Sequence, residues 1–430
     1  MTLESRFPKL DNRLRLIAVV AAPAAVAAVV VATAMVASAA GGHAMRGGRI
    51  LHLGRGIATT AAAPSDPPVL QRLTYTSPGL GGGLNHPAGV SAASGTVYVS
   101  NTGANELAAL QGGQTSIIAG SLSASGEQGD GGNATAATLY HVGGTAEDAN
   151  GDIFVADTAD NVVREISPSG VITVIAGTGR AGSGTASAYP VGHKATNVSL
   201  DYPEGVAANA DGDVFIADTY NNRVLLVNPQ GQVFDVAGTG DAGYSGDGGQ
   251  AVQASLNQPT GVAVDAQGNL YIADASNNVI RRVDAKSGII TTVAGDFAAD
   301  KSNDGLGGFS GDGGPATSAQ LNDPQGVALD GAGDLFIADT FDNAIREVTP
   351  DGTISTVVNS ASANGGIPPA GSETSGVAPT ASKLNSPYQV AIDPSTDSLY
   401  IADTRNSAIA QVTNLAQPGD AAGPTAPASS

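Results

Sequence analysis

One motif recurs six times along the chain, and this repetition restricts the possible folds more than any other feature. It reads Leu-Asn-x-Pro-x-Gly-Val, or a close variant, at residues 84–90, 200–206, 256–262 and 321–327, and residues 139–145 and 384–390 are less regular copies. Regular spacing of this kind indicates a supersecondary unit that stacks against its neighbours. We therefore expect a fold built from six copies of one unit.

Copies one to five each predict four short strands joined by tight turns. In one copy the motif is followed by the turn DGAGD (330–334) and the strand LFIADT (335–340). In another, a third strand NVIRRVD (278–284) precedes a fourth, IITTVAG (289–295). Strands such as VFIAD do not alternate apolar with polar residues, which indicates that both faces of the sheet are covered. Radial repetition of such sheets predicts an all-β fold, a six-bladed β-propeller of four-stranded antiparallel blades.

The ring of blades is predicted to close through an N-terminal strand. The sixth copy ends after SAIAQVTN (407–414) and has no fourth strand. The segment VLQRLTY (69–75) precedes the first copy and is similar to the other fourth strands. If it completes the last blade, no sheet edge is left free. The propeller is therefore predicted to extend over residues 69–414.

The repeated unit resembles the NHL repeat. The resemblance is carried by LNDPQGVALDGAGDLFIADTFDNAIREVTPDGTISTVV (321–358), including the strand IADT and the downstream Asn. The connector GDGGPAT (311–317) looks like those of NHL copies in bacterial exported proteins and teneurins. The resemblance covers about residues 69–414 and implies a six-bladed propeller that serves in binding or scaffolding. The first copy, with VSNTGANELAAL (99–110), departs most from the pattern.

The two ends of the chain have compositions unlike the repeats. Residues 1–40 predict a signal peptide or a signal-anchor transmembrane helix, because a basic segment precedes an apolar run long enough to span a bilayer. The small residues ASA (37–39) would suit cleavage. Residues 41–68 predict a flexible linker and residues 415–430 a disordered tail. We expect the propeller to lie outside the cytoplasm, either secreted or anchored in the membrane.

Composition excludes several classes of function. The chain has no Cys, so disulfides, Cys-ligated zinc and thiol nucleophiles are ruled out. The formal net charge is −20, whereas a nucleic-acid-binding protein needs a basic surface. We expect no nucleic-acid partner.

The strand order assigns the loops to two faces. If the first strand of each blade starts at the upper face, the tight turns such as DANGD (148–152) lie below. The turns after the second strand and the long, variable connectors between blades then lie above. Binding usually resides where loops are long and variable, so the upper face is the candidate binding surface. The Asp-rich lower turns lack the further ligands of a calcium loop and are interpreted as turns.

Several residues recur in nearly every copy and are interpreted as structural. The second strand ends in Asp at Asp157, Asp218, Asp274, Asp339 and Asp403, and an Asn follows four residues later in four of these copies. Such a pair would fix its turn through side-chain to backbone hydrogen bonds. The Gly-rich segment SGDGGPATSAQLNDPQGVALD (310–330) lacks the Lys of a phosphate loop and predicts the connector between two blades. Arginines 164, 281, 282 and 346 in the third strands predict solvated edges or local ion pairs.

Positions that differ between copies are better candidates for ligand binding. The x of Leu-Asn-x-Pro is predicted to lie at the mouth of the central channel, and around the ring it is His86, His141, Tyr202, Gln258, Asp323 and Ser386. The residue two positions later is Ala88, Gly143, Glu204, Thr260, Gln325 and Tyr388. The candidate ligand-binding residues of this channel mouth are His86, His141, Tyr202, Glu204, Gln258, Asp323, Ser386 and Tyr388.

The same mouth offers the only candidate metal ligands. His86, His141, Glu204 and Asp323 would suit a divalent ion if they converge. A set of only two histidines is smaller than the His set of the metal-dependent propeller lyases and gluconolactonases. A solvated funnel without a metal ion is the favoured interpretation.

Three functions follow, in order of preference. The first is an extracytoplasmic scaffold that binds a protein, peptide or glycan through its upper face without covalent chemistry. The second is a metal-dependent lyase or lactonase with its site in the channel. The third is a structural protein of the cell envelope. No nucleophile–base pair or nucleotide-binding motif was found in a suitable context, so the sequence favours a binding protein over an enzyme.

Overall fold

The computed structural model describes residues 67–73, 83–120, 126, 128–182, 193–298, 308–359 and 378–415. All of them belong to the second of the two units into which the chain divides, Pro67–Ser430. The predicted leader and N-terminal helix (1–40), most of the predicted linker and nearly all of the predicted tail lie outside the described residues. Within the part that the structure describes, no helix is long and apolar enough to cross a membrane.

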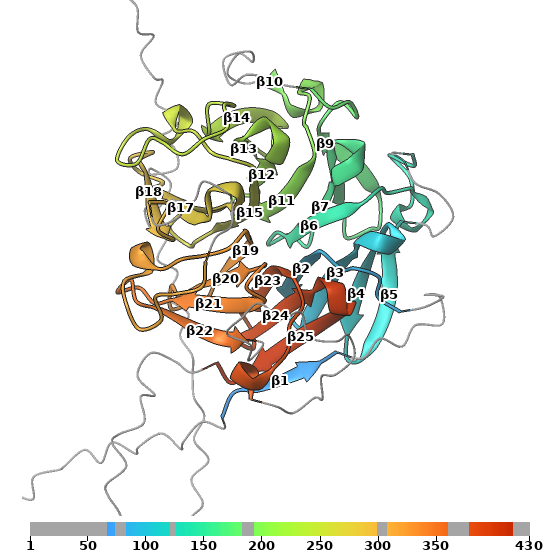
Figure 1. Ribbon diagram of the computed structural model, residues 1–430. Coiled ribbons are helices and arrows are strands. Elements are labelled where there is room, and N and C mark those ends of the chain that lie inside the picture. Colours follow the sequence, from blue (N-terminus) through green and yellow to red (C-terminus); the bar gives the residue numbers. More distant parts are fainter. Residues whose placement is uncertain are drawn as a thin grey trace, which may run out of the picture. The chain divides into compact units, whose positions relative to one another are not determined.

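The described residues form the predicted six-bladed β-propeller (Figure 1). Blade 1 contains β2 (Gly89–Ala93), β3 (Thr96–Asn101), β4 (Glu106–Gln111) and β5 (Gln114–Ala119). Blade 2 contains β6 (Val142–Glu147), β7 (Ile153–Asp157), β8 (Val162–Ile166) and β9 (Ile172–Ala176). Blade 3 contains β11 (Pro203–Ala208), β12 (Val214–Asp218), β13 (Arg223–Val227) and β14 (Gln232–Ala237), extended by the short β10 (His193–Lys194).

The second half of the ring repeats this order. Blade 4 contains β15 (Pro259–Val264), β16 (Leu270–Asp274), β17 (Val279–Val283) and β18 (Ile290–Ala294). Blade 5 contains β19 (Pro324–Leu329), β20 (Leu335–Asp339), β21 (Ala344–Val348) and β22 (Ile354–Asn359). Blade 6 contains β23 (Pro387–Asp393), β24 (Ser398–Asp403), β25 (Ala408–Thr413) and β1 (Val69–Arg72). The four strands of each blade are called a to d from the axis outward.

In the part of the chain that the structure describes, short 3₁₀ helices lie in the loops after strand b and in the connectors between blades. Five follow strand b: η1 (Thr102–Ala104), η3 (Thr158–Asp160), η5 (Thr219–Asn221), η7 (Ala275–Asn277) and η10 (Thr404–Asn406). Five others precede strand a in the connectors: η2 (Ala134–Ala136), η4 (Ala195–Asn197), η6 (Ala251–Gln253), η8 (Ala316–Ser318) and η9 (Pro379–Ala381).

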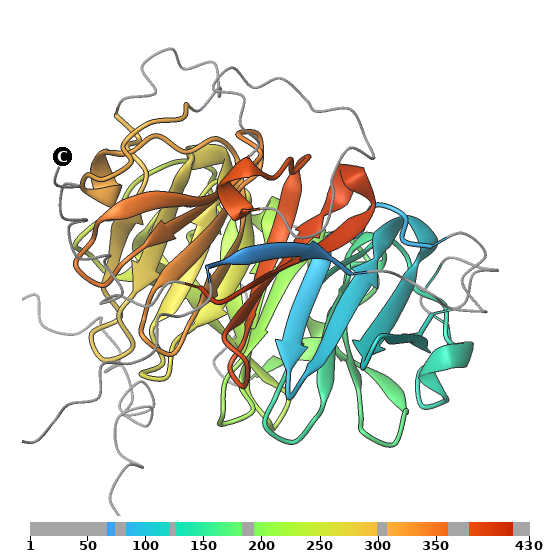
Figure 2. The same ribbon diagram turned by 90° about the horizontal axis from the view of Figure 1, so that it is seen from below.

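The N-terminal strand closes the ring, as predicted. β1 pairs with β25 in antiparallel register from Val69 opposite Thr413 to Arg72 opposite Ala410 (Figure 2). Leu70 is fully buried in the cluster that joins blades 5 and 6. The last blade therefore combines strands from both ends of the propeller.

Glycine at the end of the motif lets the inner strands converge. The a strands of neighbouring blades contact one another around the axis. A Cβ atom added to Gly205 would lie 2.0 Å from the carbonyl oxygen of Thr260 in the next blade, and one added to Gly261 would lie 2.5 Å from that of Gln325. A side chain at these positions would force adjacent blades apart.

Apolar side chains from neighbouring blades fill the spaces between the sheets. One cluster combines Phe154 of blade 2 with Ile216 and Leu225 of blade 3. The connectors contribute as well, because Ala316, Ala319 and Leu321 are buried in the cluster between blades 4 and 5. The Gly-rich segment is therefore a blade connector whose second half packs into the core.

Buried arginines fasten the connectors onto the blades. Arg346 of strand c is fully buried, with Nη1 3.2 Å from Asp339 Oδ2 and Nη2 2.8 Å from Asp312 Oδ1 in the Gly-rich connector. Arg164 and Arg281 make the equivalent pairs in blades 2 and 4. The expectation of solvated edges is therefore wrong for these three side chains, whereas the expectation of local ion pairs is confirmed.

The arginine reaches the buried aspartate from different positions in two other blades. In blade 3, Arg223 lies at the start of strand c and its Nε is 2.8 Å from Asp218 Oδ2. In blade 6, Arg72 of the closing strand lies opposite Ala410 and its Nη2 is 3.5 Å from Asp403 Oδ2. The Arg–Asp pair is thus retained although the residue that supplies the guanidinium changes.

Candidate functional site

The upper face is built on a hydrogen-bonded frame that repeats in every blade. The side chain of the last residue of strand b accepts a hydrogen bond from the backbone N–H of the second residue of the motif in its own blade. In blade 5, for example, Asp339 Oδ1 lies 2.7 Å from Asn322 N. The acceptors are Asn101, Asp157, Asp218, Asp274, Asp339 and Asp403. These side chains therefore hold the entry to strand a, and serve structure as expected.

The Asn four residues later links one blade to the next. Its side-chain oxygen accepts the backbone N–H of the x residue in the following blade, and Ser407 serves in the last blade. The acceptors are Asn105, Asn161, Asn222, Asn278, Asn343 and Ser407. The bond between blades was not predicted, and the predicted bond within the turn is also present in two blades, where the side-chain amides of Asn161 and Asn222 donate to the carbonyl oxygens of Ala159 and Tyr220.

The six x residues share one backbone conformation that places them at the rim of the channel. All have positive φ, between 47° for His86 and 55° for His141 and Tyr202. Since non-glycine residues adopt this conformation infrequently, the surrounding hydrogen bonds must maintain it. The frame therefore fixes the backbone, whereas the side chains vary between blades.

Two of the candidate residues form a cluster with two further tyrosines. Tyr202 stacks on Tyr220, with ring centroids 4.9 Å apart and an interplanar angle of 11°. The Tyr202 hydroxyl and His141 Nδ1 are hydrogen-bonded at 3.3 Å. Tyr140 and Tyr220 expose 46% and 49% of their surface. We call Tyr140, His141, Tyr202 and Tyr220 the tyrosine cluster. Glu204 lies close enough to Tyr202 to raise the pKa of the Tyr202 hydroxyl.

Burial favours the neutral forms of two members of the cluster, Tyr202 and His141. Burial, followed by the nearby Glu204 and Tyr220, raises the pKa of Tyr202 to about 12. Burial lowers the pKa of His141. Tyr202 and His141 are therefore uncharged near pH 7.

A hydrogen bond crosses the channel below this rim. The Tyr388 hydroxyl of blade 6 donates to Glu204 Oε2 of blade 3 at 2.5 Å, and these blades are opposite each other in the ring. Burial raises the pKa of Glu204 to about 7, the Tyr388 bond opposes this, and Asp323 adds to it. Burial also raises the pKa of Asp323, against a hydrogen bond from Gln325. Glu204, Asp323 and Tyr388 thus form one interacting group.

The other candidates do not join this group. His86 is exposed and its Nδ1 lies 2.8 Å from Oδ1 of its neighbour Asn85. Gln258 is exposed and accepts a hydrogen bond from Ser276. Ser386 is held through its backbone by Asn343.

The predicted metal ligands are not gathered at one point. Among the described residues, which include His86, His141, Glu204 and Asp323, no three His, Cys, Asp or Glu side chains lie close enough together to hold a metal ion. His141 contacts Tyr202, and Glu204 and Asp323 interact without either histidine.

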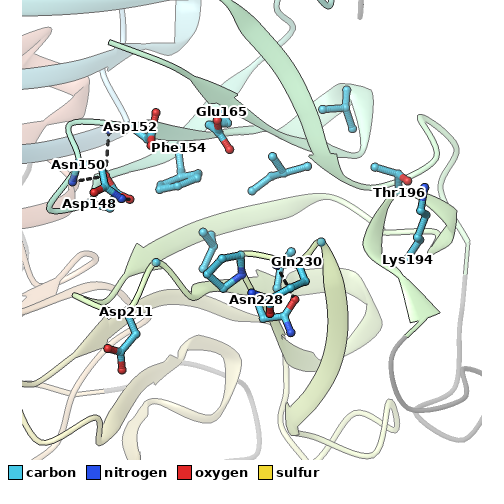
Figure 3. Close-up of a pocket in the computed structure, with 17 residues that line it drawn as sticks. Asp148, Asn150, Asp152, Phe154, Glu165, Lys194, Thr196, Asp211, Asn228 and Gln230 are labelled. Carbon is cyan, nitrogen blue, oxygen red and sulfur yellow. Dashed lines mark hydrogen bonds between the residues drawn. The ribbon is translucent and has the colours of Figure 1, made fainter. Parts of the chain in front are cut away.

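The lower face carries a separate cleft of about 520 Å³ between blades 2 and 3 (Figure 3). Asp148, Asp152 and Glu165 line one side, and Asp211 and Gln230 line the other. Asp148 Oδ1 accepts two backbone N–H groups of its own turn at 2.9 Å, so this aspartate stabilises the turn. The turns of both blades meet in this cleft, which confirms that the short turns share one face.

The architecture defines the class to which this fold belongs. Six antiparallel four-stranded blades, closed by a strand from the N-terminal side, define the class as a six-bladed β-propeller. The family model described as the teneurin NHL domain matches residues 235–306 and 307–426, and the NHL repeat model matches residues 200–225. The chain is therefore an NHL-repeat β-propeller.

Individual relatives agree with this assignment. Mouse (Mus musculus) Teneurin-4 is 32% identical over 229 residues, which cover 51% of this chain and 8% of Teneurin-4. Suppressor of quenching 1, a chloroplastic protein of Arabidopsis thaliana, is 36% identical over 92 residues, which cover 21% of this chain and 8% of that protein. The matches thus span under a tenth of these relatives.

A solved structure shares the fold. A Bacteroides thetaiotaomicron protein of unknown function aligns with a TM-score of 0.56 at 15% identity, over 80% of this chain and 76% of its own. At this identity the likeness concerns the fold alone.

Two exposed aromatic residues of the upper face were missed from the sequence. Tyr220 and Phe341, the latter 52% exposed, each follow an Asp-Thr pair at the end of strand b. Around the ring this position is Gly103, Ala159, Tyr220, Ser276, Phe341 and Arg405. Comparison of the copies at this position would have revealed the variation, because its neighbours are nearly constant.

Proposed function

We propose that this propeller is a scaffold that binds a protein or peptide partner through its upper face. The observation that carries the proposal is the tyrosine cluster, which presents exposed aromatic rings on a backbone fixed by hydrogen bonds. Tyr residues are enriched at the energetic centres of protein interfaces because they bury apolar area and retain a polar end. A surface of this kind suits a peptide chain with both apolar and polar groups.

The rigidity of the frame supports binding without a large conformational change. The x residues are held by the preceding blade, and the strand-b aspartates hold the entry to strand a. A preorganised site loses less conformational entropy when it binds. The family match supports the proposal, since NHL propellers serve mainly in binding.

Affinity capture with matched variants tests the proposal. Full-length protein with an affinity tag is incubated with envelope extract, and retained proteins are compared among wild type, Tyr220→Ser and Val171→Ser. Val171 is an exposed apolar residue in the lower turn of blade 2, 38% exposed, and serves as the control. We expect Tyr220→Ser to lose the retained partner and Val171→Ser to keep it.

Two outcomes contradict the proposal. Equal retention by the two variants would show that the upper face is not the interface. Retention of a glycan without any protein would show that the partner is a glycan and not a protein. Circular dichroism confirms that each variant has folded.

We further propose that the propeller lies outside the cytoplasm. The support is the basic and apolar character of residues 1–40. Protease added to intact cells that produce the protein with a C-terminal tag tests this location. Loss of the tag signal is expected, and full protection of the tag without cell lysis would contradict the location.

A further inference from the structure

The floor of the channel mouth collects hydrogen-bond acceptors around the axis. Glu204 and Tyr388 occupy the same position in opposite blades and meet in a hydrogen bond, so this position in strand a faces the axis. Gln325 occupies the equivalent position in blade 5. Two carboxylates and an amide oxygen are therefore available in the mouth: those of Glu204, Asp323 and Gln325.

Gln325 is a buried polar side chain with one oxygen that has no partner. It is 8% exposed, and its Oε1 accepts no hydrogen bond from any residue that the structure describes. Its side chain hydrogen-bonds the Asp323 carboxylate, which places the amide beside that acid. A buried acceptor without a donor is costly, so this oxygen indicates a missing hydrogen-bond donor.

The two rings of residues that line the mouth contain no cationic side chain. None of the twelve residues at the two ring positions is Lys or Arg. Burial raises the pKa of both carboxyl groups, and the nearby Asp323 adds to this effect at Glu204. A positively charged ligand group would therefore gain from both carboxylates.

The walls of the mouth suit an aliphatic or planar cationic side chain. Tyr202 and Tyr220 present stacked rings at the blade 3 side, where a cation or its hydrocarbon stem would pack. Blades 1 and 2 contribute Ala88 and Gly143, the two smallest residues of the second ring. The mouth thus combines acceptors on one side with two small residues on the other.

We infer that the channel mouth binds a Lys or Arg side chain of a partner peptide. This inference rests on the proposed function and identifies which chemical group of the partner enters the site. The ammonium or guanidinium donates to Asp323, Glu204 and Gln325 Oε1, and the aliphatic stem packs along the tyrosine cluster. The strong negative charge of the whole chain would steer such a basic segment toward it.

Short synthetic peptides test this inference on the full-length protein. The probes are Ac-Gly-Gly-Lys-Gly-Gly-amide and its Arg and Gln counterparts, and saturation-transfer NMR measures their binding. We expect the Lys or Arg probe to bind about tenfold more tightly than the Gln probe, and added salt to weaken the difference. Equal binding of all three probes, or no binding of any, would overturn the inference.

Matched aspartate variants localise the effect. Asp323→Asn is expected to weaken the binding of the cationic probe about tenfold, because it removes one of the two carboxylate charges in the mouth. Asp211→Asn removes the same charge from an exposed residue of the lower face and is expected to leave binding unchanged. An equal loss in both variants would show non-specific attraction to an acidic protein.

The affinity capture separates this inference from the proposed function. If Tyr220→Ser loses the partner while cationic probes fail to bind, the upper face is an interface but the channel mouth does not take a cation. If Tyr220→Ser retains the partner, the proposed function itself is wrong.

Discussion

Replacement of Arg281 by Ala should strongly destabilise the propeller, whereas the same change at the adjacent Arg282 should not. Arg281 is fully buried, with Nη1 3.2 Å from Asp274 Oδ2 and Nη2 2.7 Å from Asp247 Oδ1. Arg282 is 31% exposed, and its Nη2 lies 3.6 Å from Asp284 Oδ2. The two residues are neighbours in one strand, so the comparison isolates the effect of burial on the contribution of an ion pair to stability.

The expected difference follows from the charge that each substitution leaves behind. Removal of one partner from a buried ion pair costs about 3–5 kcal/mol, because the other charge stays buried without compensation. An exposed pair contributes less than about 1 kcal/mol. Asp274 remains buried after the substitution, and Arg281→Ala also removes the hydrogen bond to the Ser245 carbonyl that anchors the connector.

Urea unfolding followed by circular dichroism measures both variants, since the chain has no Trp. Burial raises the pKa of Asp274 to about 6 even with Arg281 present, and loss of the guanidinium raises it further. The deficit of Arg281→Ala should therefore be larger at pH 8 than at pH 5, and a second substitution, Asp274→Asn, should recover part of it. Equal loss in Arg281→Ala and Arg282→Ala would refute the assigned role of the buried arginines.

Three further predictions concern closure, strand convergence and pH. Leu70→Ala in the closing strand should lower the free energy of unfolding by about 2–5 kcal/mol, and the exposed neighbour Gln71→Ala should change it little. Gly261→Ala should lower the free energy of unfolding by about 1–3 kcal/mol, because the added Cβ atom would meet the Gln325 carbonyl oxygen. Gly331→Ala, where no atom lies near the added Cβ, should change the stability little, and thermal melts compare the two variants. The Glu204 carboxyl, whose pKa in the folded protein is about 7, faces Tyr388, Asp323 and Tyr202, and its ionisation should cost the wild type up to about 3 kcal/mol of stability between pH 4.5 and 7. Glu204→Gln should therefore make the free energy of unfolding less dependent on pH in this range. Parallel pH profiles of the two proteins in urea would disprove this.

The sign of the pH effect follows from the protons bound in each state. The folded protein retains the Glu204 proton up to about pH 7, whereas the unfolded chain releases it near pH 4.5. The folded state is therefore favoured at low pH, and this contribution is lost as the pH rises through the folded pKa.

The architecture was predictable because its determinants are local and repeated. The motif places Gly205 and its counterparts where strands converge, and the apolar second strands require coverage on both faces. Closure was predictable from the missing fourth strand of blade 6. Each of these inferences needs only the register of the copies and the rule that sheet edges are paired or protected.

The site was less predictable because it depends on contacts across the ring. Glu204 and Tyr388 are 184 residues apart in sequence, and no repeat pattern shows that their side chains meet. Burial of Arg346 was also hidden, since its second partner Asp312 lies in a connector that reads as a solvent-exposed glycine loop. The failure of the histidines to converge depends on side-chain direction, which spacing alone does not determine.

Photo-crosslinking tests the central claim, that the upper face binds a protein partner, most directly. A photoreactive phenylalanine analogue replaces Tyr220 or Phe341 on the upper face, and Gln230 or Gln267 in lower turns, in the full-length protein produced in its native cells. The account predicts that irradiation yields the same covalent protein adduct from both upper positions and none from the lower ones. Adducts from the lower positions alone, or no adduct from any upper position, would contradict it.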